Sequence, residues 1–211
     1  MSIEKPEAIR VVCLDWGGVL LRICRSWEEA CTAAGLALPG EPVSEGIRRK
    51  RRELSEHYQL GRMHCDAYFQ AVADLSPGYA SSDIRRLHDA YLIDEYHGAL
   101  QLAQELAGHA RVRGALLSNT NHSHWLRQSD FTAAATLPHR VASYQQGLAK
   151  PEPKFYEALE AAVGARAEQI AFFDDLQPNI DAARAMGWQA VRVDPDGDTI
   201  AQVRTALSGV L

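Results

Sequence analysis

The sequence predicts an α/β fold, in which a parallel sheet carries an all-helical insert after its first strand. Apolar runs of strand length predict strands buried on both faces, and they cover residues 9–14, 112–117, 170–173 and 189–193. Amphipathic patterns between the last three runs predict helices over residues 153–163 and 178–186. Such alternation of strands and helices is typical of a parallel sheet covered by helices on both faces.

The remaining elements follow from the same patterns. After the first strand, residues 22–96 show one helical pattern after another and no convincing strand, with predicted helices over 26–34, 43–58, 65–74 and 81–92. Glycine and proline residues separate these helices. Further along, we expect a weaker strand over 136–142 and a last helix over 198–207. The sequence therefore predicts a core of residues 1–21 and 97–211 and an insert of residues 22–96.

Composition and charge narrow the class of protein. The chain has 211 residues, 46% of them hydrophobic and 23% charged, and its net charge of −5 argues against a nucleic-acid partner. No apolar run reaches the roughly 18 residues that suggest a membrane span, and the start of the chain lacks the pattern of a signal peptide. We expect a cytoplasmic protein without nucleic-acid or membrane partners, as a monomer or small homo-oligomer.

Two compositional features have plain structural interpretations. The four cysteines show no C-x-x-C pairing and fall on apolar faces, which predicts reduced, buried thiols instead of a zinc or disulfide framework. Residues 48–52 are all basic, but five consecutive residues wrap around a helix, and nearby acids partly neutralise them, namely Glu45, Glu53 and Glu56. We interpret this run as a solvated helix and not as a nucleic-acid patch.

Polar side chains cluster where the predicted strands end. Asp15 follows the first strand, Ser118 and Asn119 end the second, and Asp174 and Asp175 end the third. Ligands of open parallel sheets bind at the carboxyl ends of the strands, and a buried acid is costly to desolvate unless it has a partner or a function. Together with Lys150, which precedes the next helix, these side chains predict a site for a phosphate group and a divalent cation.

Four segments, in this order, resemble the four motifs of the haloacid dehalogenase-like (HAD) superfamily. They are Asp15-Trp16-Gly17-Gly18-Val19-Leu20, Leu116-Leu117-Ser118-Asn119-Thr120-Asn121, Lys150-Pro151-Glu152-Pro153, and Phe172-Phe173-Asp174-Asp175 with Asn179. Within the superfamily, these forms are most similar to the subgroup that contains bacterial alpha-D-glucose-1-phosphate phosphatase. The resemblance implies a Rossmann-like core of residues 1–21 and 97–211 and a small helical cap of residues 22–96.

The resemblance also implies how a phosphate group would be bound and attacked. Asp15 would be the nucleophile, and its attack on phosphorus would form an aspartyl-phosphate, which divides a difficult hydrolysis into two easier steps. Turn amides, a hydroxyl and a lysine would surround the phosphate, from Trp16, Gly17, Ser118, Asn119 and Lys150.

For the metal, the resemblance implies Mg²⁺, which prefers oxygen ligands. Asp15, Asp175 and the carbonyl of Gly17 would hold the ion, and Asp174 would be an auxiliary ligand or a supporting residue. Asn179 would orient Asp175 or the waters on the metal.

One departure from the family pattern affects the expected chemistry. Most phosphatases of the superfamily have a general acid-base aspartate two residues after the nucleophile, where this chain has Gly17. General acid-base catalysis contributes about 10²- to 10⁴-fold in rate, so its absence predicts a slower enzyme or one that favours a substrate with a good leaving group, such as a sugar 1-phosphate. His64, in the insert, is a candidate replacement, and residues 61–64 with Trp27 are expected to line the pocket.

The sequence therefore predicts a Mg²⁺-dependent phosphatase that acts on a small phosphorylated metabolite, such as a hexose 1-phosphate. Three alternatives remain open: a catalytically weak phospholigand-binding or regulatory protein, a haloacid dehalogenase and a phosphomutase. A dehalogenase needs no metal, so the pair Asp174 and Asp175 argues against it. A protein that only binds its ligand would not need the nucleophile Asp15.

Overall fold

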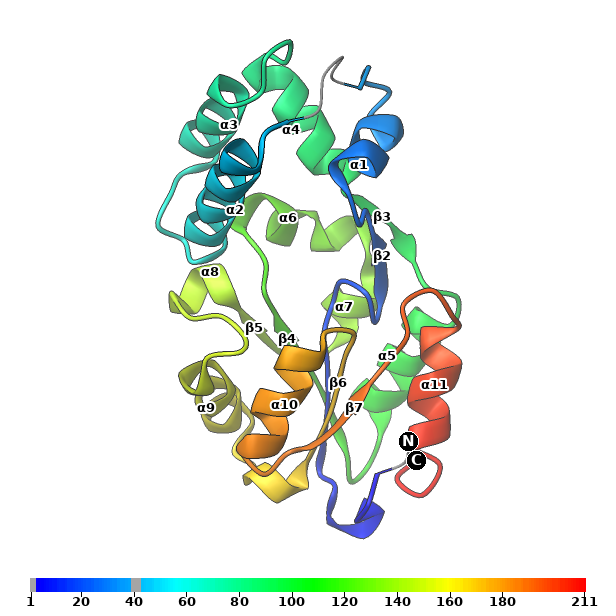
Figure 1. The fold of residues 1–211 in the computed structure, drawn as a ribbon. Coiled ribbons are helices and arrows are strands. Elements are labelled where there is room, and N and C mark those ends of the chain that lie inside the picture. Colours follow the sequence, from blue (N-terminus) through cyan, green and yellow to red (C-terminus); the bar gives the residue numbers. More distant parts are fainter. Residues whose placement is uncertain (1–2, 39–42) are drawn as a thin grey trace.

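Five parallel strands form the central sheet, in the order β5-β4-β1-β6-β7 (Figure 1). The computed structural model describes residues 3–38 and 43–211. The strands are β1 (Val11–Leu14), β4 (Arg113–Ser118), β5 (His139–Ala142), β6 (Ile170–Asp174) and β7 (Gln189–Arg192). The predicted α/β fold with a parallel sheet and a helical insert is confirmed.

Helices cover both faces of this sheet. One face packs against α5 (Ala99–Gly108), α7 (Thr132–Thr136) and α11 (Thr199–Ala206), and the other against α9 (Pro153–Val163) and α10 (Gln177–Ala185). Successive residues of a strand point to opposite faces, so Val12 and Leu14 of β1 join the first cluster while Val11 and Cys13 join the second. All four are completely buried, which explains why the sequence of β1 is a continuous apolar run.

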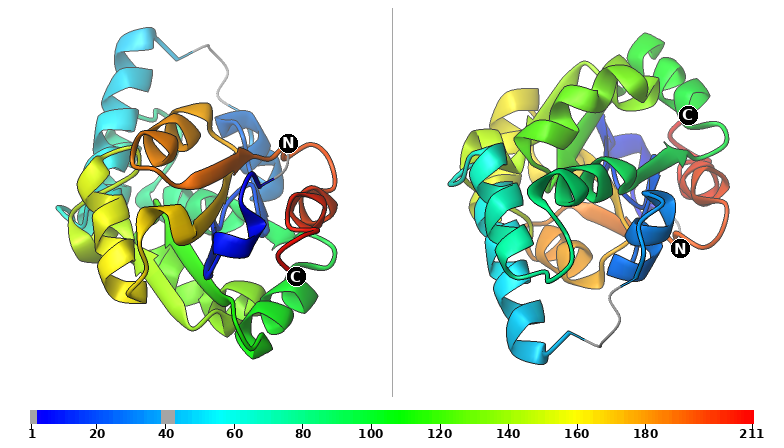
Figure 2. Two further views of the ribbon diagram at one scale, coloured as in Figure 1. Left: turned by 90° about the horizontal axis from the view of Figure 1, so that it is seen from below. Right: turned by 90° about the horizontal axis from the view of Figure 1, so that it is seen from above.

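The insert joins the core through a short two-stranded ribbon. Strand β2 (Leu21–Ile23) pairs antiparallel with β3 (Leu92–Glu95). Four helices lie between these strands, namely α1 (Trp27–Ala33), α2 (Glu45–Gln59), α3 (Cys65–Asp74) and α4 (Ser81–Ala90). They lie beyond the carboxyl edge of the sheet, as the side view and the view from above show (Figures 1 and 2).

The structure corrects several predicted boundaries. The prediction that residues 22–96 contain no strand was wrong at both ends of that segment, where β2 and β3 lie, and α4 therefore ends at residue 90 instead of 92. Helix α2 begins after Ser44, whose hydroxyl accepts a hydrogen bond from the amide of Ile47, a typical N-cap. Helix α5 was not predicted, and part of the weak strand expected over 136–142 is the end of α7.

The remaining elements are short. They are α6 (His122–Leu126), α8 (Ser143–Gln146) and the 3₁₀ helices η1 (Pro6–Ala8), η2 (Arg127–Asp130) and η3 (Ala167–Gln169). Of these, α6 and η2 follow β4 and α8 follows β5, so these three lie at or near the carboxyl edge of the sheet. Within residues 3–38 and 43–211, no helix combines the length and apolar character that a bilayer crossing requires. The four cysteines are free thiols, of which Cys13, Cys24 and Cys31 are buried and Cys65 is half-buried.

Candidate active site

Three carboxylates meet at the carboxyl edge of the sheet. Asp15 follows β1, Asp174 is the last residue of β6, and Asp175 comes directly after it. One oxygen of each carboxylate lies within 4.8 Å of the others, and all three residues are buried. The strand pairing explains the arrangement, because β1 and β6 are hydrogen-bonded neighbours and end side by side.

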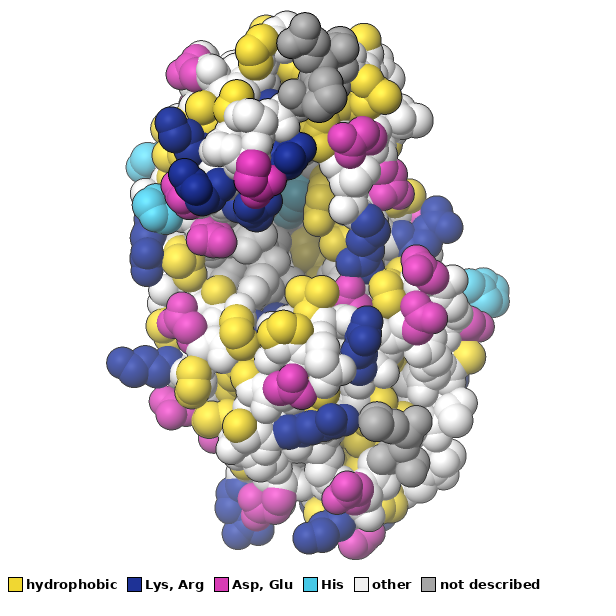
Figure 3. Space-filling model, viewed as in Figure 1, with side chains coloured by type: hydrophobic (Ala, Val, Ile, Leu, Met, Phe, Trp, Pro, Cys, Tyr) yellow, Lys and Arg dark blue, Asp and Glu magenta, His cyan; other side chains and the backbone are white. Residues whose placement is uncertain are grey.

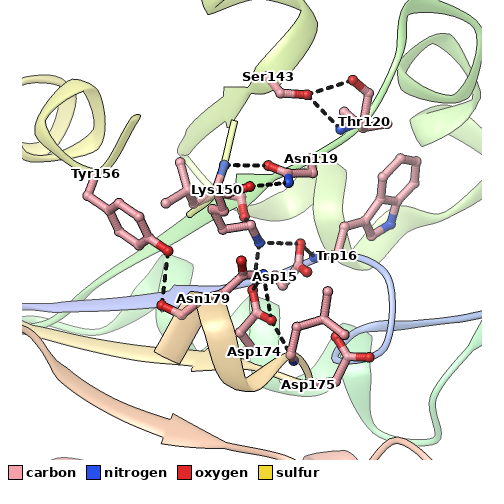
Figure 4. A network of polar contacts seen from close by, with 12 residues as sticks. Asp15, Trp16, Asn119, Thr120, Ser143, Lys150, Tyr156, Asp174, Asp175 and Asn179 are labelled. Carbon is pink, nitrogen blue, oxygen red and sulfur yellow. Dashed lines mark hydrogen bonds and ion pairs between the residues drawn. The ribbon is translucent and has the colours of Figure 1, made fainter. Parts of the chain in front are cut away.

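Lys150 joins two of these carboxylates (Figure 4). Its ammonium nitrogen lies 2.9 Å from Oδ1 of Asp15 and 2.7 Å from Oδ2 of Asp174, and it donates a hydrogen bond of 2.8 Å to the carbonyl of Leu117. The side chain of Asn119 fixes the backbone of Lys150 from both directions: its amide group donates to the carbonyl of Lys150 and its oxygen accepts from the amide, each at 2.8 Å. The lysine is therefore held in one position with its charge beside Asp15.

Asp174 is bound on both of its oxygens. Oδ1 accepts hydrogen bonds from the amide of Leu176 at 2.8 Å and from Nδ2 of Asn179 at 3.0 Å. Oδ2 accepts from Lys150 and, at 2.9 Å, from Asn179. Asn179, which was expected to orient Asp175 or metal-bound water, thus contacts Asp174 in the described structure. Because Leu176 and Asn179 hold its carboxylate in place, Asp174 can position the ammonium group of Lys150.

Burial and neighbouring charges shift the pKa values of both Asp15 and Lys150. Desolvation, reinforced by the negative charges of Asp174 and Asp175, raises the pKa of Asp15 to about 7, although Lys150 opposes the shift. Burial alone would lower the pKa of Lys150, but the charges of Asp15 and Asp174 outweigh it and raise that pKa. Lys150 therefore stays charged at neutral pH. The amide of Trp16 also donates to Oδ1 of Asp15 at 2.7 Å.

The pattern of these residues agrees with one family of proteins. A family model for haloacid dehalogenase-like hydrolases matches residues 9–187, from before β1 to just after α10. The chain belongs to the haloacid dehalogenase-like (HAD-like) hydrolase family. The superfamily resemblance found in the sequence is confirmed, and the matched range contains all four motif segments.

Individual HAD-like relatives cover most of the chain. Phosphatase MT3486 of Mycobacterium tuberculosis (strain CDC 1551 / Oshkosh) is 26% identical over 192 residues, or 87% of this chain and 72% of the relative. The structure of wild-type HAD family enzyme BT-2542 from Bacteroides thetaiotaomicron, in complex with magnesium and inorganic phosphate, has a TM-score of 0.72 at 19% identity, covering 90% of this chain and 96% of that chain. L-2-haloacid dehalogenase from Xanthobacter autotrophicus, with chloropropionic acid covalently bound, has a TM-score of 0.63 at 23% identity. The match covers 95% of this chain and 83% of that chain. At such identities, the two structures establish the fold.

The acidic cluster of this HAD-like hydrolase fits a divalent cation. Among the described residues, two cations form ion pairs with the three buried carboxylates, namely Lys150, which is buried, and Arg25 at the rim. Nη1 of Arg25 lies 2.7 Å from Oδ2 of Asp175, and the arginine side chain is 40% exposed whereas that of Asp175 is 4% exposed. The site therefore carries excess negative charge, which a hard cation with oxygen ligands would neutralise. Nothing in the sequence pattern around Arg25 indicates this contact.

The glycines after Asp15 make room for this cluster. Gly18 has a φ of +83°, and a Cβ there would lie 2.6 Å from Cγ of Asp175 and 2.8 Å from Nη2 of Arg25. Gly17 lacks a positive φ, but a Cβ there would lie 3.0 Å from Cδ1 of Ile23. The side chain of Ile23, from β2, thus fills the space beside the position where an acid-base aspartate would begin.

A cavity of about 260 Å³ lies between the core and the insert, in the region where one face of the molecule is hollowed (Figure 3). Predicted phosphate-binding residues line its core side, namely Trp16, Gly17, Ser118 and Asn119. On the insert side, Trp27 lines it as expected, whereas residues 61–64, which include His64, are not among the lining residues. His88, which the sequence did not single out, lines the same side.

Proposed function

We propose that this HAD-like hydrolase is a Mg²⁺-dependent phosphomonoester phosphatase that acts through an aspartyl-phosphate on Asp15. The observation that carries the proposal is the buried cluster in which Lys150 contacts Asp15 and Asp174 beside Asp175. A nucleophile, a fixed cation and an acidic pair are the parts that phosphoryl transfer uses. The phosphatase among its relatives, and the magnesium and phosphate bound by a structural neighbour, support the proposal.

In the proposed mechanism, Asp15 attacks the phosphorus atom of the substrate, the bond from phosphorus to the ester oxygen breaks, and that oxygen leaves and takes up a proton from solvent. The backbone amides of Trp16 and Gly17, with Ser118 and Asn119, would surround the phosphoryl oxygens. Lys150 would neutralise part of the charge that these oxygens carry in the transition state. When bound by Asp15, Asp175 and the carbonyl of Gly17, Mg²⁺ would reduce the repulsion between the anionic nucleophile and the anionic substrate. Water then cleaves the aspartyl-phosphate.

We further propose that residues 1–21 and 97–211 form the catalytic core and that residues 22–96 form the cap that selects the substrate. The cavity between them supports this division, because core residues line one side and insert residues the other. A small phosphorylated metabolite, and in particular a hexose 1-phosphate, fits the absence of an acid at Gly17. Its anomeric oxygen is a better leaving group than an ordinary alcohol and depends less on general acid catalysis.

The experiment that tests this function is phosphate release from a panel of sugar phosphates, nucleotides and p-nitrophenyl phosphate, with Mg²⁺ and with a chelator. The parent should release phosphate only with Mg²⁺, and Asp15→Asn should lower kcat at least about 10³-fold. Asp181→Asn, an exposed aspartate on α10, is the matched control and should retain activity.

Other outcomes would favour the alternatives. Release of halide from a 2-haloacid without Mg²⁺ would identify a dehalogenase. Transfer of phosphate between positions of a sugar, without release, would identify a phosphomutase. Binding of phosphorylated ligands without any turnover would overturn the enzymatic proposal and indicate a phospholigand-binding protein.

A further inference from the structure

One serine of the core contacts both the insert and the loop that follows β4. Ser143, the first residue of α8, is completely buried. Its Oγ accepts a hydrogen bond of 2.9 Å from the amide of Thr120 and lies 2.8 Å from the carbonyl oxygen of the same residue (Figure 4). It also lies 2.8 Å from the carbonyl oxygen of Gln59, the last residue of α2. This side chain thus joins the insert to the phosphate loop, residues 118–121, which begins with two of the predicted phosphate-binding residues.

The hydroxyl group of Ser143 has one proton for two carbonyl oxygens. A serine hydroxyl donates one hydrogen bond, and the two carbonyls lie at the same distance from it. When Gln59 is in place, the proton can bond to either carbonyl. When Gln59 moves away, the proton bonds to Thr120 alone, so the buried hydroxyl keeps a partner. The position of the insert therefore decides how Ser143 bonds to the phosphate loop.

The carbonyl of Gln59 needs such a donor because it lies at the end of a helix. The last four carbonyls of an α-helix have no partner within the helix. Helix α2 ends in a Schellman motif, in which the amides of Gly61 and Arg62 bond to carbonyls one turn earlier. This motif leaves the carbonyl of Gln59 to Ser143, so the core completes the end of an insert helix.

The neighbours of Thr120 in the phosphate loop are fixed by other contacts. Asn119 bonds to the backbone of Lys150, and the side chain of Asn121 caps α6. Between them, the amide and the carbonyl of Thr120 both lie against Ser143. Thr120 also lines the cavity between core and insert. A change in the hydrogen bonds of Ser143 therefore reaches the wall that faces the substrate.

We infer that Ser143 is a positioning residue, whose hydroxyl couples the seating of α2 on the core to the conformation of the phosphate loop. This inference rests on the proposed phosphatase function and adds to it a residue that acts through Thr120. With α2 seated, the loop has the conformation that binds phosphate. Because coupling between two sites is reciprocal, phosphate bound on the loop also favours the seated insert.

The first test is Ser143→Ala, which leaves the buried amide of Thr120 without its partner. The Kd for inorganic phosphate, measured by calorimetry with Mg²⁺, and the KM for p-nitrophenyl phosphate should rise about 10-fold. The kcat should change less than about 3-fold, because Asp15 and Lys150 keep their mutual contact. A purely structural role would lower the unfolding temperature and leave the Kd of the folded protein unchanged.

The second test disturbs the same contact from the insert. A Cβ at Gly61 would collide with the carbonyl oxygen of Tyr144, so Gly61→Ala should push the end of α2 away from α8 and leave the bonds between Ser143 and Thr120 in place. It should raise the Kd for phosphate about 3-fold or more. Gly35→Ala is the matched control, because Gly35 ends α1 in the same motif with a φ of +63° compared with +67°. Among the described residues, no atom lies within 4 Å of a Cβ there.

The double variant shows whether the two effects have one cause. If Gly61→Ala acts through Ser143, adding it to Ser143→Ala should raise the Kd by less than about 1.5-fold more. Full additivity, an unchanged Kd in Gly61→Ala, or an equal rise in Gly35→Ala would overturn the inference.

Failure of the inference is distinguishable from failure of the proposed function. If the parent binds phosphate with the expected changes in the variants but hydrolyses no substrate, the coupling stands and the phosphatase proposal is wrong. If the parent hydrolyses p-nitrophenyl phosphate and the Kd for phosphate is the same in Ser143→Ala, the phosphatase proposal stands and the coupling is wrong. If the parent neither hydrolyses p-nitrophenyl phosphate nor binds phosphate, both are wrong.

Discussion

Gly17 lacks a side chain where a general acid would act, and its surroundings show what a substitution would meet. The backbone at Gly17 does not require glycine, because its φ lies outside the positive range. The obstacle is Ile23, whose Cδ1 would lie 3.0 Å from a new Cβ. A side chain here needs space that β2 currently fills.

This contact predicts how substitution of Gly17 by aspartate would affect kcat. Gly17→Asp alone should give little gain in kcat, because the new carboxylate displaces Ile23 from its place in the cavity wall. Combined with Ile23→Ala, it should raise kcat for phosphate esters of ordinary alcohols by about 10². The rate with p-nitrophenyl phosphate, whose leaving group needs no proton, should change much less.

Steady-state kinetics of both variants and of Ile23→Ala alone would check this expectation. An equal gain with both kinds of substrate would show that the aspartate acts in some other way than as a proton donor.

At the scale of elements, the linker between β2 and α1 contacts the acidic cluster. Arg25 lies in this linker, and its guanidinium group contacts Oδ2 of Asp175, one of the three carboxylates that would hold a metal ion. The side chain is 40% exposed, so it can leave the carboxylate for solvent. Arg25 thus acts as a counter-charge for Asp175.

We therefore expect Arg25→Gln to bind Mg²⁺ more tightly than the parent. An ion pair with a partly exposed arginine is worth about 1 kcal/mol, and releasing this competition should lower the Kd for Mg²⁺ about 3- to 5-fold. Isothermal titration calorimetry without substrate measures the effect, and Arg22→Gln, at an exposed arginine of β2, is the control. An unchanged or higher Kd for Arg25→Gln would show that arginine and metal do not compete.

The elements also show which structural features are readable from a sequence. The buried strands of the sheet and the helices α3 and α9 were predicted at their observed bounds or within a few residues, because the strands are continuous apolar runs and the helices repeat their apolar residues over ten or more positions. Strands β2 and β3 have three and four residues, with one buried residue each, and so give almost no pattern. Helix α5 does carry buried residues at helical spacing, Ala99, Leu102, Ala103 and Leu106, but two of them are small alanines and the pattern was overlooked.

At the site, too, some residues can be predicted from a sequence pattern and others cannot. Asp15, Lys150 and Asp174 were predictable because each stands at a strand end or in a motif, and the structure brings them together, while their catalytic roles stay predictions. His88 and Arg25 were not predictable, because their importance depends on where the insert lies against the core. An isolated histidine on an apolar helix face gives no indication of that contact.

At the scale of the molecule, the insert and the core meet through two stacked histidines. His88 belongs to α4 of the insert and His124 to α6 of the core. Nε2 of His124 hydrogen-bonds the carbonyl of His88 at 2.8 Å, and Oγ of Ser143 in the core donates to the carbonyl of Gln59 in the insert at 2.8 Å. Burial lowers the pKa of His124 to about 4, with Arg127 adding to the shift.

This pair predicts how stability depends on pH. Because both histidines have lower pKa values in the folded than in the unfolded state, the unfolded state binds more protons between about pH 4 and 6.5. The free energy of unfolding should therefore fall as pH falls through this window, by roughly 3 kcal/mol for His124 alone.

Urea unfolding at pH 7, 5.5 and 4.5 would measure this fall in the parent and in the double variant His88→Gln with His124→Asn. Carboxylates add to the acid sensitivity of both proteins, so the difference between them isolates the histidines. If the two proteins lose stability in parallel, the stacked pair is not the source of the pH dependence.

The strand order has a consequence for how the chain is completed during synthesis. The central strand β1 pairs with β4 and β6, whose residues begin at 113 and 170, so both of its neighbours leave the ribosome long after it does. Such distant pairings are slow to form and leave apolar strands exposed in the meantime. The nascent chain therefore carries an unpaired, wholly apolar β1 while the four insert helices are synthesised. During this interval, a chaperone that binds apolar segments would protect β1 from aggregation.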